Sequence, residues 1–166
     1  MEILKYSEID LRETIKRSEQ DVNNVLDTVS EILNNVKDKG DDAVKSYTEK
    51  FDGVLVDNLK VTEDEIKEAY DTLDDSLLTA LKQAAANIEK FHKKQIPQEW
   101  EMEVNPGITA GQIVRAINSA GCYIPGGRAA YPSSILMTVI PAKIAGCKEI
   151  CITTPPNAQG KVNPVI

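Results

Sequence analysis

The chain has 166 residues, a length that suits one domain or one and a half, and 42% of them are hydrophobic. It carries 26 acidic and 19 basic residues, a net charge of −7, which argues against nucleic-acid and membrane-surface partners because both select basic patches. With no run of 18 apolar residues, no signal-peptide core and three cysteines, the chain is expected to have no membrane span and to lie in a reducing cytoplasm.

The first predicted helix carries a long apolar stripe. Ser18 and Asp21 form a possible capping box in front of it, and Gly40 ends it. Apolar residues recur in steps of three and four, which is typical of one helix face. We interpret the stripe as core packing, with a dimer interface as the alternative. The stripe comprises Val22, Val25, Leu26, Val29, Ile32, Leu33 and Val36.

Three further helices follow. Their expected starts are Asp41, a capping box of Thr62 with Glu65, and Asp75 or Ser76. The last of them must stop before Pro97, because the residue before a proline disfavours helix. The residues expected to face inward are Val44, Tyr47, Phe51, Ile66, Ala69, Tyr70, Leu73, Leu78, Leu81, Ala85, Ile88 and Phe91.

The pattern changes to strands after Trp100. The turn signal Asn105-Pro106-Gly107 predicts a hairpin with antiparallel strands near 101–105 and 109–117. Strands at 121–124 and 148–153 then flank an apolar helix at 132–145, which contains Pro141. A crossover helix makes the two strands parallel, so the fold class is α/β, with a helical N-terminal half, a hairpin and the start of a βαβ unit.

The last residues carry a helix-start signal. Asn163 suits an N-cap and Pro164 the first helical position. A parallel sheet of two strands also leaves an unpaired edge and an uncovered helix face. We therefore expect this chain to be the N-terminal part of a longer protein.

Pro125-Gly126-Gly127 follows a strand and precedes a helix, where α/β proteins bind ligands. The glycines allow a close approach or a positive φ, and the helix start favours a negative group, to which Arg128 could add charge. Tyr123 and Tyr131 could pack on a flat ring. No phosphate-binding fingerprint is present, so a ligand site and a simple turn both remain open.

Other chemistry is scarce. His92 is the sole histidine and is expected on the surface, beside two lysines. The cysteines lack a metal-binding spacing and are expected to be small buried hydrophobic residues, with Cys122 and Cys151 in strands. The sequence therefore offers no metal ligand set and no catalytic residue.

Residues 121–156, GCYIPGGRAAYPSSILMTVIPAKIAGCKEICITTPP, closely resemble the signature region of histidinol dehydrogenase, and residues 39–53, KGDDAVKSYTEKFDG, resemble a second pattern of that family. The resemblance implies a longer, homodimeric enzyme that uses zinc and NAD. Such enzymes oxidise L-histidinol through L-histidinaldehyde to L-histidine, the last steps of histidine biosynthesis. It also implies two incomplete Rossmann-like domains: residues 1–122 would belong to the first, and residues 123–166 would begin the second.

The resemblance transfers one site residue. The tyrosine of the family's YIPGG pattern contacts NAD and falls on Tyr123, whereas the zinc ligands and the acid–base pair would lie beyond Ile166. We therefore expect the 166 residues alone to be inactive. The alternatives are a non-catalytic nucleotide-binding module and a helical interaction domain.

Overall fold

A computed structural model describes residues 11–126 and 129–166, with side chains from residue 25 onward. The chain divides into two compact units, with the division after Tyr47. This division does not test the predicted domain boundary after residue 122, which stays a prediction.

Helix α1 (Leu11–Lys39) begins earlier than predicted. Ser18 and Asp21 lie inside it, so the predicted capping box there is wrong. The stretch before Ser18 is rich in Leu, Arg, Glu and Lys, which are good helix formers and extend the helix. Its end is as predicted: Gly40 follows with a φ of +58°, a left-handed conformation that glycine adopts without strain.

Most of the apolar stripe of α1 is exposed, so the predicted core packing is wrong for Val25, Leu26, Val29 and Leu33, whereas Ile32 and Val36 are half-buried. The side chain of Val22 lies outside the described ones. Val25 is 52% exposed and Leu33 is 64% exposed. The residue described as buried in this unit is Ala43, at the start of α2 (Asp41–Asp52). One short neighbouring helix offers too little surface to cover a stripe of this length.

Helices α3 (Glu63–Thr72) and α4 (Asp75–His92) start where the sequence indicates. In the capping box of α3, the Glu65 N–H donates to Thr62 Oγ1 at 3.2 Å and the Thr62 N–H donates to Glu65 Oε2 at 2.8 Å. A short 3₁₀ turn, η2 (Lys93–Gln95), ends the helical half before Pro97, as predicted.

The inward faces of these helices are only partly covered. Ala69, Leu73, Leu78, Leu81, Ala85 and Ile88 are half-buried. Four large residues expected inside are exposed instead, and for them the prediction is wrong: Phe51, Ile66, Tyr70 and Phe91.

Strands β1 (Trp100–Asn105) and β2 (Ile108–Gln112) form the predicted antiparallel hairpin. Gly107 has a φ of +77° in its turn. The second strand is shorter than predicted, because the backbone beyond Gln112 bonds to a side chain: the Val114 N–H donates to Glu99 Oε1 at 3.0 Å. One hairpin face is apolar and open to solvent, with Trp100 53% and Met102 54% exposed.

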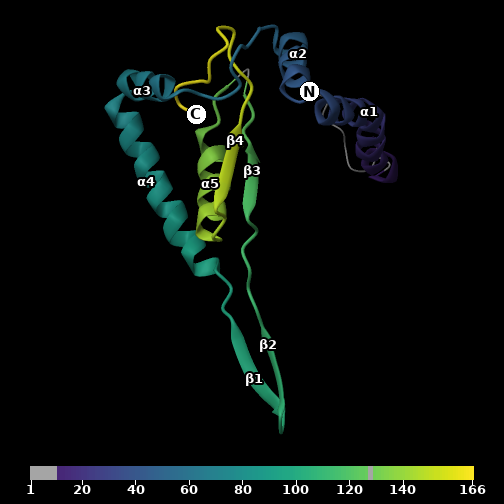
Figure 1. Ribbon diagram of the computed structural model, residues 1–166, viewed down its shortest axis with the longest axis vertical. Helices are drawn as coiled ribbons and strands as arrows, with labels where there is room; N and C mark the ends of the chain where they lie inside the picture. Colours follow the sequence, from purple (N-terminus) through teal and green to yellow (C-terminus); the bar gives the residue numbers. More distant parts are fainter. Residues whose placement is uncertain (1–10, 127–128) are drawn as a thin grey trace. The chain divides into compact units, whose positions relative to one another are not determined.

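The βαβ unit forms as predicted. Strands β3 (Ser119–Tyr123) and β4 (Glu149–Thr153) pair in parallel, and α5 (Pro132–Ile144) connects them (Figure 1). Helix α5 contacts both strands and also α4. The buried side chains of this unit come from β3 and the residue after it: Cys122 is 6% exposed and Ile124 is 0% exposed.

Helix α5 is covered less than its composition suggests. It contacts elements on two sides, yet Met137 is 63% exposed. Pro141 lies inside the helix, as predicted, and the Ala145 N–H donates to the Pro141 carbonyl at 2.8 Å. None of the described helices is long and apolar enough to cross a membrane.

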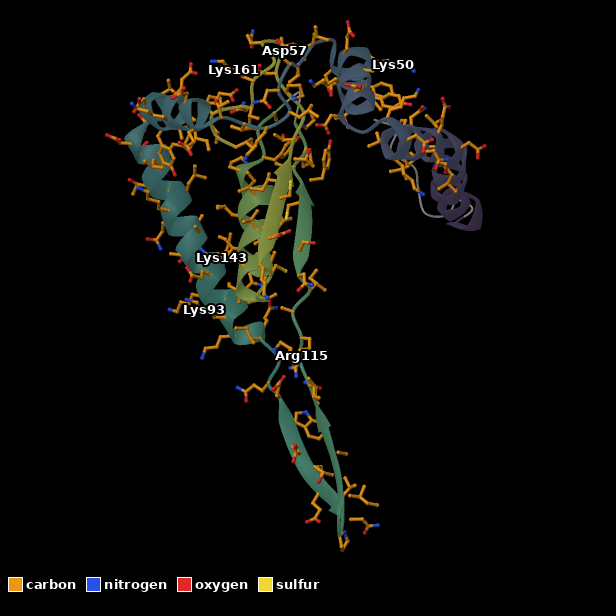
Figure 2. All side chains as sticks on the ribbon, in the orientation of Figure 1. Lys50, Asp57, Lys93, Arg115, Lys143 and Lys161 are labelled. Atoms are coloured by element: carbon orange, nitrogen blue, oxygen red, sulfur yellow. The ribbon has the colours of Figure 1, made fainter. Side chains whose placement is uncertain are left out.

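The C-terminal segment folds back onto α3. The side-chain oxygen of Asn157 accepts the Gln159 N–H at 2.9 Å and the Lys161 N–H at 3.0 Å, which closes a turn. Lys161, labelled in Figure 2, bonds to Glu68 of α3 at 2.7 Å. The helix start predicted at Asn163 is a single turn, in which Asn163 Oδ1 accepts the Val165 N–H at 3.0 Å.

The cap of α4 generates a pH prediction. The Ser76 hydroxyl, the Ser76 N–H and the Leu77 N–H donate to Asp74 and hold the pKa of its carboxyl below the usual value. A lowered pKa means that this cap stabilises the fold above the unfolded-state pKa of Asp74, and that the stabilisation is lost as pH falls through the lower folded-state pKa.

In Ser76→Ala we expect the pKa of Asp74 to rise toward its usual value, because the largest contribution is removed, but to stay lowered by the two N–H groups. An NMR titration of the Asp74 carboxyl measures this. The pKa of Glu65, whose largest contribution comes from Thr62, is the internal control and should not move. An unmoved Asp74 would contradict the prediction.

Candidate functional site

The candidate site lies where β3 and β4 end side by side. Their register pairs Tyr123 with Thr153. The ladder continues one residue further, since the Ile124 N–H donates to the Thr153 carbonyl at 2.8 Å. The carboxyl ends of parallel strands form the edge of an open α/β sheet where ligands bind, so the first requirement of a site is met.

Tyr123 projects from the face of the sheet that α5 leaves open. Successive side chains of a strand point to opposite faces, and the neighbours Cys122 and Ile124 are the buried ones. Tyr123 is 64% exposed. Its ring is therefore available to a flat ligand, while its backbone is fixed by the pairing with β4.

Little space is left for a side chain at Gly126, and its backbone is not left-handed. The described glycines with positive φ are Gly40, Gly53, Gly107, Gly146 and Gly160, so of the two properties that the sequence left open, a close approach or a positive φ, Gly126 does not use the second. A Cβ on Gly126 would lie 3.2 Å from Pro155 Cδ and 3.3 Å from Thr154 Oγ1. The segment after β3 thus runs against the segment after β4. Gly127 and Arg128 lie outside the described residues.

The first turn of α5 follows the loop that leads from the end of β3. Pro132 occupies the first turn, and Tyr131 precedes it without a side-chain capping hydrogen bond. Tyr131 is 43% exposed, so the second candidate aromatic residue is also accessible. The first turn contains no acidic residue, and the partial positive charge of a helix start favours a negative group of a ligand.

The other candidate residues do not assemble into a catalytic centre. His92 is half-buried, with its ring edge-on to Phe91 at 5.3 Å between centroids. Cys122 is buried as predicted, but Cys151 is exposed, so its predicted burial is wrong. Its strand position is paired with Gly121, on the face of the sheet that points away from α5. Among the side chains of residues 25–126 and 129–166, no three histidine, cysteine or acidic groups are placed to hold a metal ion.

Two features of this edge escaped the sequence interpretation. Thr153 shares a face and a register position with Tyr123, and Pro155 limits the space at Gly126. The predicted strand boundaries could have indicated that Thr153 pairs with Tyr123, because the register at the start of two parallel strands determines which residues pair at their ends. The second depends on loop geometry that periodicity does not encode.

The comparisons with known proteins agree with the resemblance. A family model described as "Histidinol dehydrogenase" matches residues 15–166. Histidinol dehydrogenase of Methanocaldococcus jannaschii is 56% identical over 123 residues, 74% of this chain and 29% of the relative. That of Bacillus subtilis (strain 168) is 48% identical over 122 residues, again 74% of this chain and 29% of the relative.

A solved structure is also similar. The crystal structure of histidinol dehydrogenase from Elizabethkingia anophelis has a TM-score of 0.81 and 38% identity, and the match covers 86% of this chain and 33% of that chain. The chain therefore spans a third or less of the length of these proteins.

The two glycines of this region should respond differently to a methyl group. Gly126→Ala forces Pro155 or Thr154 to move and should lower the unfolding free energy of the chain by about 1–3 kcal/mol. The control is Gly121→Ala, because a Cβ at Gly121 meets nothing within 4 Å. That change should leave stability unchanged or raise it by about 0.4–1 kcal/mol. Denaturant unfolding followed by circular dichroism compares them, and equal stabilities would contradict the packing role of Gly126.

Proposed function

Because the chain belongs to the histidinol dehydrogenase family, we propose that it forms part of an NAD-dependent histidinol dehydrogenase in which Tyr123 contacts the cofactor. The observation that carries this is the position of Tyr123: it is 64% exposed at the carboxyl end of β3, on the open face of the sheet. The aromatic ring can lie against a ring of NAD, and the hydroxyl can form one hydrogen bond.

The proposed reaction of the whole protein is a four-electron oxidation. The alcohol of L-histidinol loses a hydride and a proton to give L-histidinaldehyde. Water then adds to the aldehyde, and loss of a second hydride and two protons from this hydrate gives the carboxylate of L-histidine. One NAD molecule accepts each hydride, which is the chemistry that the cofactor supplies when bound.

The described residues fit NAD and do not fit zinc. For NAD they offer an exposed tyrosine and a strand edge beside the start of α5. For zinc the described part of the chain holds no ligand group, so we derive no step through the metal from these residues. We also propose that the whole protein uses zinc, forms a homodimer and is located in the cytoplasm. Membership of the family supports these three proposals.

The first test uses the 166-residue chain by itself. We expect no NADH formation from L-histidinol and no zinc retained after dialysis, because the described residues lack a ligand set and the chain spans about a third of its relatives. Absorbance at the NADH band and metal analysis measure the two quantities. Stoichiometric zinc or NADH production would overturn the prediction, and the M. jannaschii relative is the positive control for the assay.

The second test concerns Tyr123 in the product of the complete reading frame that encodes this chain. Tyr123→Phe should weaken NAD binding roughly three- to tenfold, which corresponds to one lost hydrogen bond of about 0.5–1.5 kcal/mol. Tyr123→Ala should weaken it further, because the ring contact is lost as well. Calorimetric titration with NAD measures the affinities.

The matched control is Tyr70→Ala. Tyr70 is 60% exposed, close to the 64% of Tyr123, but lies on α3. Melting curves of all variants separate binding from stability. If Tyr123→Ala lowers the melting temperature and leaves the NAD affinity of the folded protein equal to that of Tyr70→Ala, Tyr123 is a structural residue and the proposed contact is wrong.

A further inference from the structure

We infer that Thr153 is a second contact residue for the same dinucleotide, acting through its side-chain hydroxyl. The inference rests on the proposed function and deepens it, because it assigns a specific polar partner on the neighbouring strand. It starts from the register of the sheet, in which Thr153 is the residue paired with Tyr123.

Pairing in register places the two side chains next to each other. Adjacent strands lie about 4.8 Å apart, and paired residues of a parallel sheet project from the same face. Both residues are exposed on the face opposite to Cys122 and Ile124. A nucleotide that covers the ring of Tyr123 is wider than this spacing, so it reaches Thr153.

The backbone of Thr153 is fixed while its hydroxyl stays available. Its carbonyl accepts the Ile124 N–H at 2.8 Å, which holds the strand end in place. Hydroxyls of helical threonines, such as Thr79 and Thr138, donate to the carbonyl four residues earlier. The Thr153 hydroxyl forms no hydrogen bond to any other residue that the structure describes. It can therefore donate or accept one bond without breaking another.

The surroundings of Thr153 leave the approach open. Gly121 lies on the same face of β3, and a Cβ built there meets nothing within 4 Å. The next residue, Thr154, faces the other way, with its Oγ1 3.3 Å from the Cβ position of Gly126. The two consecutive threonines therefore have different tasks: Thr154 packs the loops together, and Thr153 faces the ligand.

The experiment compares Thr153→Val and Thr153→Ser in the product of the complete reading frame, with NAD as the probe. Valine keeps the shape and β-branching of threonine and removes the hydroxyl, so the strand should be preserved. We expect Thr153→Val to raise the dissociation constant of NAD three- to tenfold, as for one hydrogen bond. Thr153→Ser should stay within about twofold of the parent, because it keeps the hydroxyl.

The control is Thr109→Val, which makes the same change at an exposed strand threonine of the hairpin. It should leave NAD affinity unchanged. If the parent binds NAD and Thr153→Val binds it as well as Thr109→Val does, this inference is wrong and the proposed function stands. If the parent binds no NAD, the proposed function fails first. The KM for NAD should rise in Thr153→Val while kcat is unchanged, a pattern that a general loss of stability would not produce.

Discussion

The parallel pairing of β3 with β4 is the constraint on which the candidate site depends. One hydrogen bond past the end of β3, from the Ile124 N–H to the Thr153 carbonyl, carries the ladder to the point where both strands leave the sheet. Ile124 itself is fully buried. The burial of Ile124 fixes the backbone at the end of β3, and Tyr123 and Thr153 project from the opposite face of the sheet. A shift of one residue in this register would exchange the buried face for the exposed one.

Local signals in the sequence predicted the elements well, because each depended on neighbours along the chain. The capping box of Thr62 with Glu65, the stop before Pro97 and the turn at Gly107 are all determined within a few residues. The strand–helix–strand order likewise implied parallel pairing. The predicted start of α1 was wrong because two local signals competed. The good helix formers before Ser18 outweighed the capping motif that favours a helix start there.

Burial was predicted poorly, because it depends on what lies across from each element. Periodicity identified which residues of a helix share a face, but Leu33 and Phe91 on such faces are exposed in this chain. The candidate site shows the same difference between features that the sequence pattern predicts and contacts between distant segments. Tyr123 was predicted as a contact residue from its place at a strand end and from a family pattern, whereas the packing of Gly126 against Pro155 arises between two loops that are far apart in sequence. Such contacts leave no trace in composition or spacing.

The hairpin has a consequence for how this polypeptide behaves in solution. The outer edges of its two strands pair with no other strand that the structure describes, and Trp100, Met102 and Val104 present an apolar face to water. Open edges beside exposed apolar side chains are templates for strand addition between molecules. Two glutamates on the opposite face, Glu101 and Glu103, supply charge repulsion that counteracts stacking. Concentration and ionic strength should therefore govern aggregation of the isolated chain, with salt favouring it by screening those charges.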